Sequence, residues 1–132
     1  MKNFLSATAL LFSLIICSCN KDIRRFNEDI IGNWTWASSH SSTGTQMLSN
    51  NPSETYSLTF RTDHTFSNSS FCIIGGPTEG IFQVKRSGTD KIIILISQYG
   101  ALDSFEISVD KDHLRLIEAI DSELWIHNFT KD

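Results

Sequence analysis

The stretch FEISVDKDHLRL, residues 105–116, alternates apolar and polar side chains on both sides of a short polar turn. A period of two residues is typical of a β-strand with one buried and one solvated face, because successive side chains point to opposite sides of a sheet. The stretch therefore predicts an antiparallel hairpin that turns at residues 110–112. Its apolar members are Phe105, Ile107, Val109, Leu114 and Leu116.

The same alternation recurs through the chain after residue 31, punctuated by turn residues. Most connections have hairpin length, whereas residues 39–54 are long, polar and rich in Ser and Asn. A meander of short strands removes its open edges most simply by closing into an up-and-down barrel. We therefore expect an all-β, eight-stranded antiparallel barrel, with a sandwich or half-open barrel as the alternative. The predicted strands are 32–38, 55–61, 64–72, 79–86, 91–97, 103–109, 113–119 and 123–130.

Length and charge limit the function classes. The chain has 132 residues and a formal net charge of −4, with no basic cluster. One domain fits this length. Nucleic acid is not an expected partner, because binding to phosphates requires a positive patch.

The N-terminus has the composition of an export signal. One positive charge precedes an apolar run over residues 4–16, which is shorter than the ~20 residues that a membrane-spanning helix needs. After it, Ile23, Phe26 and Ile30 recur at helical spacing. This pattern predicts a short tether and helix over residues 19–30, laid against a barrel domain at 31–132.

The residues Ile16-Cys17-Ser18-Cys19 resemble a bacterial lipobox. The resemblance implies that residues 1–18 are a lipoprotein signal peptide and that Cys19 is the acylated first residue of the mature chain. It implies a lipid anchor in the outer membrane of the cell envelope, on its periplasmic or surface-exposed face. Cys72 is then left without a disulfide partner. The alternative is cleavage elsewhere, which leaves Cys19 free to bridge Cys72.

The stretch IIGNWTW, residues 30–36, resembles the opening strand of lipocalins, in which Gly and Trp stand as Gly32 and Trp34 do here. LTFRTDHTFS, residues 58–67, is similar to a hairpin of small lipocalin-like lipoproteins of Bacteroidota, although His64 replaces the usual Gly. The resemblance implies an eight-stranded barrel closed at one end by Trp34. Lipocalins stack an Arg of the last strand over this Trp, and Lys131 is the candidate replacement.

A candidate ligand cavity follows from strand alternation. If Phe66 points inward, Asn68, Ser70 and Cys72 share its face, and polar groups inside a barrel need partners, water or a ligand. The alternative is a bulge that turns Phe71 inward and the serines outward. Cys72 is expected to be a small buried hydrophobe. The predicted cavity residues are Trp36, Tyr56, Phe66, Asn68, Ser70 and Phe82.

No arrangement of residues in the sequence indicates a catalytic, metal or cofactor site. The four histidines lack ligand spacing, and no paired carboxylates stand at an obvious cleft position. We therefore expect a non-enzymatic, membrane-anchored lipocalin-like protein that binds a small apolar ligand or acts as an accessory binding module of the envelope. The alternative is a protein-docking or hydrolase-inhibitor module that uses the loop 39–54 to contact an envelope protein.

Overall fold

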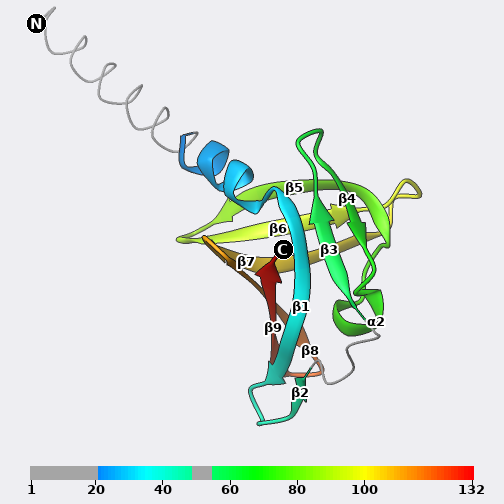
Figure 1. The fold of residues 1–132 in the computed structure, drawn as a ribbon. Coiled ribbons are helices and arrows are strands. Elements are labelled where there is room, and N and C mark those ends of the chain that lie inside the picture. The colour runs from blue at the N-terminus through cyan, green and yellow to red at the C-terminus, as the bar shows by residue number, and fades with distance from the viewer. Residues whose placement is uncertain (1–20, 49–54) are drawn as a thin grey trace, which may run out of the picture.

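The computed structural model describes residues 21–48 and 55–132. A helix over residues 21–30 precedes a chain made almost entirely of strands (Figure 1). The strands are β1 (Gly32–Ser41), β2 (Gln46–Leu48), β3 (Ser57–Phe60), β4 (Thr65–Asn68), β5 (Glu79–Ser87), β6 (Asp90–Ile96), β7 (Leu102–Asp110), β8 (His113–Ile120) and β9 (Glu123–Lys131). A single helical turn, α2 (Phe71–Ile74), lies between β4 and β5.

The sheet closes on itself. Antiparallel pairing follows the order β1-β3-β4-β5-β6-β7-β8-β9, and β9 returns to β1 from Trp34↔Lys131 to Ser41↔Trp125. The short β2 extends the edge of β1 beyond the point where β3 leaves it. The predicted eight-stranded up-and-down barrel with a short N-terminal helix is therefore confirmed.

Two strand ends differ from the prediction by more than two residues. A β-bulge between Trp36 and Ser38 lets β1 keep pairing with β9 as far as Ser41. The first part of the expected 39–54 loop is therefore strand, and β2 takes up more of it, while residues 49–54 lie outside the described residues. The strand expected over 64–72 ends at Asn68, because the chain turns into α2.

The interior of the barrel is filled by apolar side chains for most of its length. These come from alternate positions of every barrel strand, as Phe105 and Ile107 do on β7. Phe26 and Ile30 of the helix belong to the same buried cluster, and the Trp34 indole N–H donates to the Ile30 carbonyl at 2.8 Å. The helix thus covers one end of the barrel, which we call the helix end.

The β3–β4 turn explains why His64 can replace glycine. His64 has φ = 63°, the left-handed conformation that glycine adopts most easily. Asp63 stabilises the turn by accepting hydrogen bonds from both the backbone N–H and the hydroxyl of Thr65. The hydrogen bonds of the Asp63 side chain therefore support the turn in which His64 adopts this backbone conformation.

Candidate functional site

The end of the barrel opposite the helix has a polar interior, and we call it the polar end. In Figure 1 this end carries β2, α2 and the turn between β8 and β9. Four half-buried side chains on inward positions form its rim, and four buried ones lie beneath them. The rim consists of Tyr56, Asp103, Glu118 and Trp125, and the buried layer of Trp36, Ser39, Ser70 and His127.

Strand register places six of these residues next to one another in pairs. Glu118 pairs with Trp125 across β8 and β9, and Ser39 pairs with His127 across β1 and β9. On the other side, the Trp36 backbone N–H donates to the Tyr56 carbonyl at 2.8 Å. The β1 bulge is decisive, because it shifts the alternation by one residue and turns Ser39 inward.

A chain of hydrogen bonds crosses the buried layer. The Trp36 indole N–H donates to Ser39 Oγ at 2.9 Å, and Ser39 Oγ lies 2.7 Å from His127 Nδ1. His127 Nε2 lies 2.9 Å from Glu118 Oε1. When His127 carries its proton on Nε2, Ser39 donates to Nδ1 and His127 donates to the carboxylate, so every donor in the chain is used. We call Trp36, Ser39, His127 and Glu118 the relay.

The relay contains a serine, a histidine and a carboxylate, the groups of a nucleophilic triad. A nucleophile must reach its substrate, yet Ser39 is 0% exposed and His127 1% exposed. The Trp36 N–H also occupies Ser39 Oγ. This geometry suits a buried polar network that fixes the packing of the interior better than it suits attack on a substrate.

Aromatic rings flank the relay on both sides. The Trp36 and Tyr56 rings meet edge to face, with centroids 6.0 Å apart and an interplanar angle of 75°. The Trp125 ring stacks on His127 with a centroid distance of 6.3 Å and an angle of 11°. The rim therefore combines two aromatic surfaces with two carboxylates.

Asp103 experiences an unfavourable environment for its charge. Burial raises the pKa of the Asp103 carboxyl, and the negative charge of Glu118 adds to this effect, although the Ser104 N–H opposes it. Gly76 passes directly over this carboxylate, since a Cβ there would lie 3.0 Å from Asp103 Oδ2. The two rim carboxylates are therefore close enough to influence each other.

The six predicted cavity residues do not form one site. Phe66 and Phe82 belong to the filled core, where Phe82 meets Phe60 edge to face at 4.9 Å. The Asn68 amide donates to the carbonyls of Gly75 and Pro77 and therefore holds the loop after α2. The structure brings Trp36, Tyr56 and Ser70 together at the polar end.

Two other expectations about this segment are affected by α2. Cys72 is exposed, so the prediction of a buried hydrophobe is wrong, because the helical turn replaces the strand that would have directed it inward. The Phe71 side chain, which the bulge alternative turned inward, lies outside the described part of the structure. Ser70 is fully buried, and its Oγ has no hydrogen-bond partner among the described residues.

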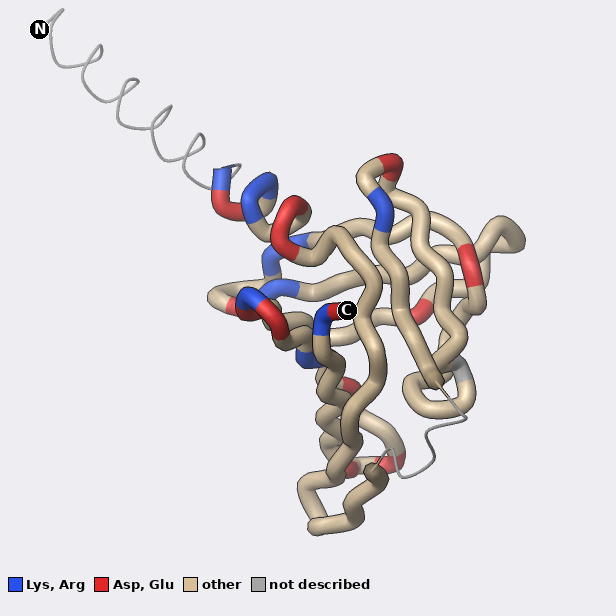
Figure 2. The backbone as a smooth tube through the Cα atoms, viewed as in Figure 1, with Lys and Arg blue, Asp and Glu red and all other residues tan. Residues whose placement is uncertain are grey.

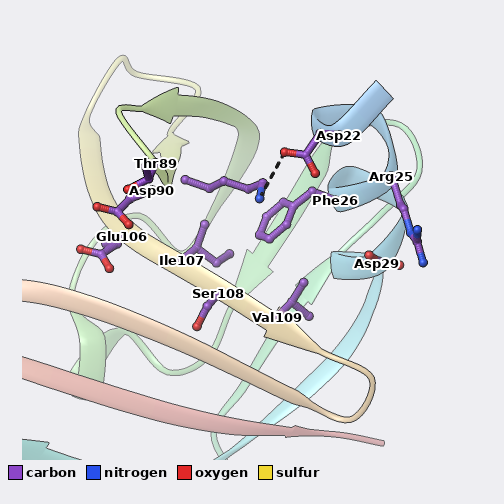
Figure 3. Close-up of a pocket in the computed structure, with 11 residues that line it drawn as sticks. Asp22, Arg25, Phe26, Asp29, Thr89, Asp90, Glu106, Ile107, Ser108 and Val109 are labelled. Atoms are coloured by element: carbon purple, nitrogen blue, oxygen red, sulfur yellow. Dashed lines mark ion pairs between the residues drawn. The ribbon is translucent and has the colours of Figure 1, made fainter. Parts of the chain in front are cut away.

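A hollow lies at the helix end, between the helix, the β5–β6 turn and β7 (Figure 3). It has a volume of about 470 Å³, and charged side chains line much of it. Asp22 pairs with both Arg86 and Lys91, and the Lys91 ammonium lies 4.9 Å from the centre of the Phe26 ring. These contacts attach the helix to the barrel, and the charges of the hollow partly neutralise one another.

Neither a metal centre nor a spanning helix emerges from the described residues. Within 21–48 and 55–132, no three His, Cys, Asp or Glu side chains are grouped so that they could hold a metal ion. In the same ranges, no helix is both long and apolar enough to cross a membrane.

The fold places the chain among eight-stranded antiparallel up-and-down barrels. No protein-family model matches the chain, and no curated protein matches it in sequence. Among solved structures it is similar to a barrel described as "De novo design of a fluorescence-activating beta barrel", with 18% identity and a TM-score of 0.43. That alignment covers 80% of this chain and 96% of the designed one.

Proposed function

We propose that the chain is a lipid-anchored, non-enzymatic binding module of the cell envelope that holds a small ligand at the polar end of its barrel. The observation that carries this proposal is the rim of Tyr56, Asp103, Glu118 and Trp125. These side chains are half-buried, face inward and surround a layer of buried polar groups. Binding sites typically combine apolar or aromatic walls with a few convergent polar groups.

The contrast between the two barrel ends supports this assignment. Phe26 and Ile30 of the helix and the Trp34 indole fill the helix end. Along β1, the inward positions nearer the helix carry Trp34 and Trp36. The inward positions at the polar end carry the smaller Ser39 and Ser41. Small side chains take up less of the cross-section of an eight-stranded barrel, whose interior holds at most one small ligand. The polar end is therefore where a ligand meets the least competition from side chains.

The proposed anchor gives the module an orientation. Only Asn20 separates Cys19 in sequence from the helix described over residues 21–30, and acylation of Cys19 would hold the helix end next to the bilayer. The polar end would then face away from the membrane, toward the aqueous compartment from which a ligand would enter. The non-enzymatic part of the proposal is supported by the burial of Ser39 within the relay.

Native mass spectrometry of protein purified from its natural host in a non-ionic detergent tests ligand carriage. We expect a retained small molecule that is lost in Trp125→Ala, which removes one wall of the rim. The matched control is Leu124→Ala, because Leu124 is the exposed neighbour on the opposite face of β9. Wild-type protein that retains no small molecule would count against the proposal.

A second candidate, protein docking at the β2 hairpin, is favoured by exposed apolar side chains. Met47 and Leu48 of β2 are 41% and 51% exposed, and Leu124 is 52% exposed. The hairpin adjoins Leu124, whose carbonyl accepts a hydrogen bond from the Ser42 backbone N–H at 2.8 Å.

Deleting residues 39–54 would remove Ser39 from the relay, so a pull-down with the double variant Met47→Ser/Leu48→Ser is the cleaner test. Leu102→Ser is the control at another exposed site. If the double variant captures the same proteins as the wild type, this candidate function is wrong.

A further inference from the structure

Charge is unevenly distributed along the barrel axis. All ten Lys and Arg residues of the described ranges lie in the helix, in the turns and strand ends beside it, or on the barrel wall next to it. Figure 2 shows these basic segments gathered around the helix, whereas acidic segments alone mark the opposite end. The basic residues are Lys21, Arg24, Arg25, Arg61, Lys85, Arg86, Lys91, Lys111, Arg115 and Lys131.

The polar end carries five carboxylates and, in the described part of the chain, no Lys or Arg. They are Glu79, Asp103, Glu118, Asp121 and Glu123. At the helix end, acidic groups are paired with basic ones, as Asp22 is with Arg86 and Lys91. Asp103 and Glu118 face inward, and within the described ranges neither is paired with a Lys or Arg, which leaves a negative potential at the rim that attracts cations. Burial is the main reason that the pKa of the Asp103 carboxyl is raised, and the negative charge of Glu118 adds to that rise.

Two features of the rim indicate a ligand that is more than a bare ion. The Tyr56 and Trp125 rings are half-buried on inward positions, and aromatic faces attract organic cations. Ser70 follows Ser69, whose backbone N–H donates to the Ser57 carbonyl, so Ser70 lies at the level of Tyr56. Its hydroxyl is fully buried, with no partner among the described residues, which leaves a polar group free for a ligand.

We propose that the polar end binds a small organic cation with an apolar body. Its ammonium group lies between the carboxylates of Asp103 and Glu118, and its apolar part lies against Tyr56 and Trp125. This inference rests on the proposed function and deepens it by naming the class of ligand. A metal ion alone fits less well, because the described residues provide no group of three ligands.

Three ten-carbon amphiphiles test the charge requirement: decyltrimethylammonium, decanoate and uncharged decyl maltoside. Each is titrated below its micelle concentration, with binding followed by calorimetry and tryptophan fluorescence. We expect decyltrimethylammonium to bind about tenfold more tightly than the other two. Asp103→Asn and Glu118→Gln should each weaken the cation by about tenfold, since each removes one negative charge from the rim.

The variants are chosen to keep the fold intact. Glu118→Gln retains a carbonyl oxygen that can accept the hydrogen bond from His127 Nε2, and thermal melting of each variant verifies folding. The matched control is Glu106→Gln, which removes an equal charge at the hollow beside the helix. Its affinity for decyltrimethylammonium should equal that of the wild type.

Each alternative result has a distinct meaning. If decanoate or decyl maltoside binds as tightly as the cation, the ligand class is wrong while the proposed function stands. If none of the three binds, the class and the small-ligand function both fail. A lysine-rich peptide is the fourth probe. If it binds more tightly than decyltrimethylammonium, and loses affinity in Asp121→Asn/Glu123→Gln but not in Asp103→Asn, the partner is a basic protein and the small-cation proposal is wrong.

Discussion

The ammonium group of Lys131 lies 5.1 Å from the centre of the Trp34 indole, at the end of the barrel that the helix covers. The stem of Lys131 passes over Gly32, where a Cβ would lie only 2.9 Å from Lys131 Cε. Gly32, Trp34 and Lys131 therefore form one stack, and the Trp34 N–H extends it to the helix through the Ile30 carbonyl. The cation of the last strand thus lies over the Trp34 ring at this end of the barrel.

Gly32→Ala should destabilise the protein by about 1–3 kcal/mol, because φ = 141° is strained for alanine and the new Cβ meets the lysine stem. Lys131→Met keeps most of the stem but removes the cation, so its cost should stay near ~0.5–1 kcal/mol. Urea denaturation of both variants, with Lys111→Met as the control at an exposed turn, provides the measurement. If Gly32→Ala costs nothing once Lys131 is also changed to Ala, the contact rather than the backbone conformation is responsible.

Strand alternation was enough to predict the barrel, because period-two patterns such as the one from Phe105 to Val109 report one buried face directly. It failed where tertiary contacts change the local rule. The pattern Phe66, Asn68, Ser70 continues as a strand in sequence, yet the Asn68 amide binds the Gly75 and Pro77 carbonyls and the chain turns into α2. No local signal reports such a contact.

The relay was missed for a related reason. Simple alternation from Trp34 and Trp36 places Ser38 inward, whereas the bulge places Ser39 there. Ser39 and His127 are 88 residues apart, and no spacing motif connects them. The clue available in the sequence was the lack of Lys and Arg over residues 116–130, which include Glu118, Trp125 and His127 of the polar end.

The raised pKa of Asp103 predicts an unusual pH dependence of stability. The folded state holds the Asp103 proton more tightly than the unfolded state, so this group stabilises the protein below pH 3.8, the ordinary pKa of an aspartate side chain. That contribution is lost as pH rises through the raised value. Asp103→Asn should therefore gain stability relative to the wild type between acidic and neutral pH, as measured by urea denaturation from about pH 3 to pH 7.

Asp63 provides the opposite case within the same chain. Its hydrogen bonds from the hydroxyl and the backbone N–H of Thr65 lower the pKa of its carboxyl. Its stabilising contribution is present above pH 3.8 and is lost as pH falls through the lowered value, so Asp63→Asn should lose stability toward neutral pH. Equal pH slopes for the two variants would contradict the assignment of Asp103 to a desolvated site.

Acylation of Cys19 predicts a specific change in mass and location. Protein from the natural host should carry fatty acyl chains on a mature N-terminal Cys19 and should fractionate with membranes, since several chains hold a protein firmly on a bilayer. Cys19→Ala should abolish both, whereas Cys17→Ala should leave the anchor unchanged because residue 17 is removed with the signal. Intact-mass measurement decides between this outcome and an unacylated chain in which Cys19 is oxidised to Cys72.

The relay predicts a stability defect without a catalytic one. Ser39→Ala leaves the Trp36 N–H without an acceptor and His127 Nδ1 without a donor inside the barrel, so it should cost about 1–3 kcal/mol in urea denaturation. Ser38→Ala is the matched control, because the neighbouring Ser38 hydroxyl is half-buried and accepts a bond from the Asn128 amide instead. A double-mutant cycle with Trp36→Phe should show that the two residues are coupled, since both belong to one network.

A fluorophosphonate probe should leave wild-type Ser39 unlabelled, because the hydroxyl is enclosed and already accepts an N–H. Labelling of Ser39 that disappears in His127→Gln would mean that the barrel opens to expose a working nucleophile, and the non-enzymatic assignment would then be wrong.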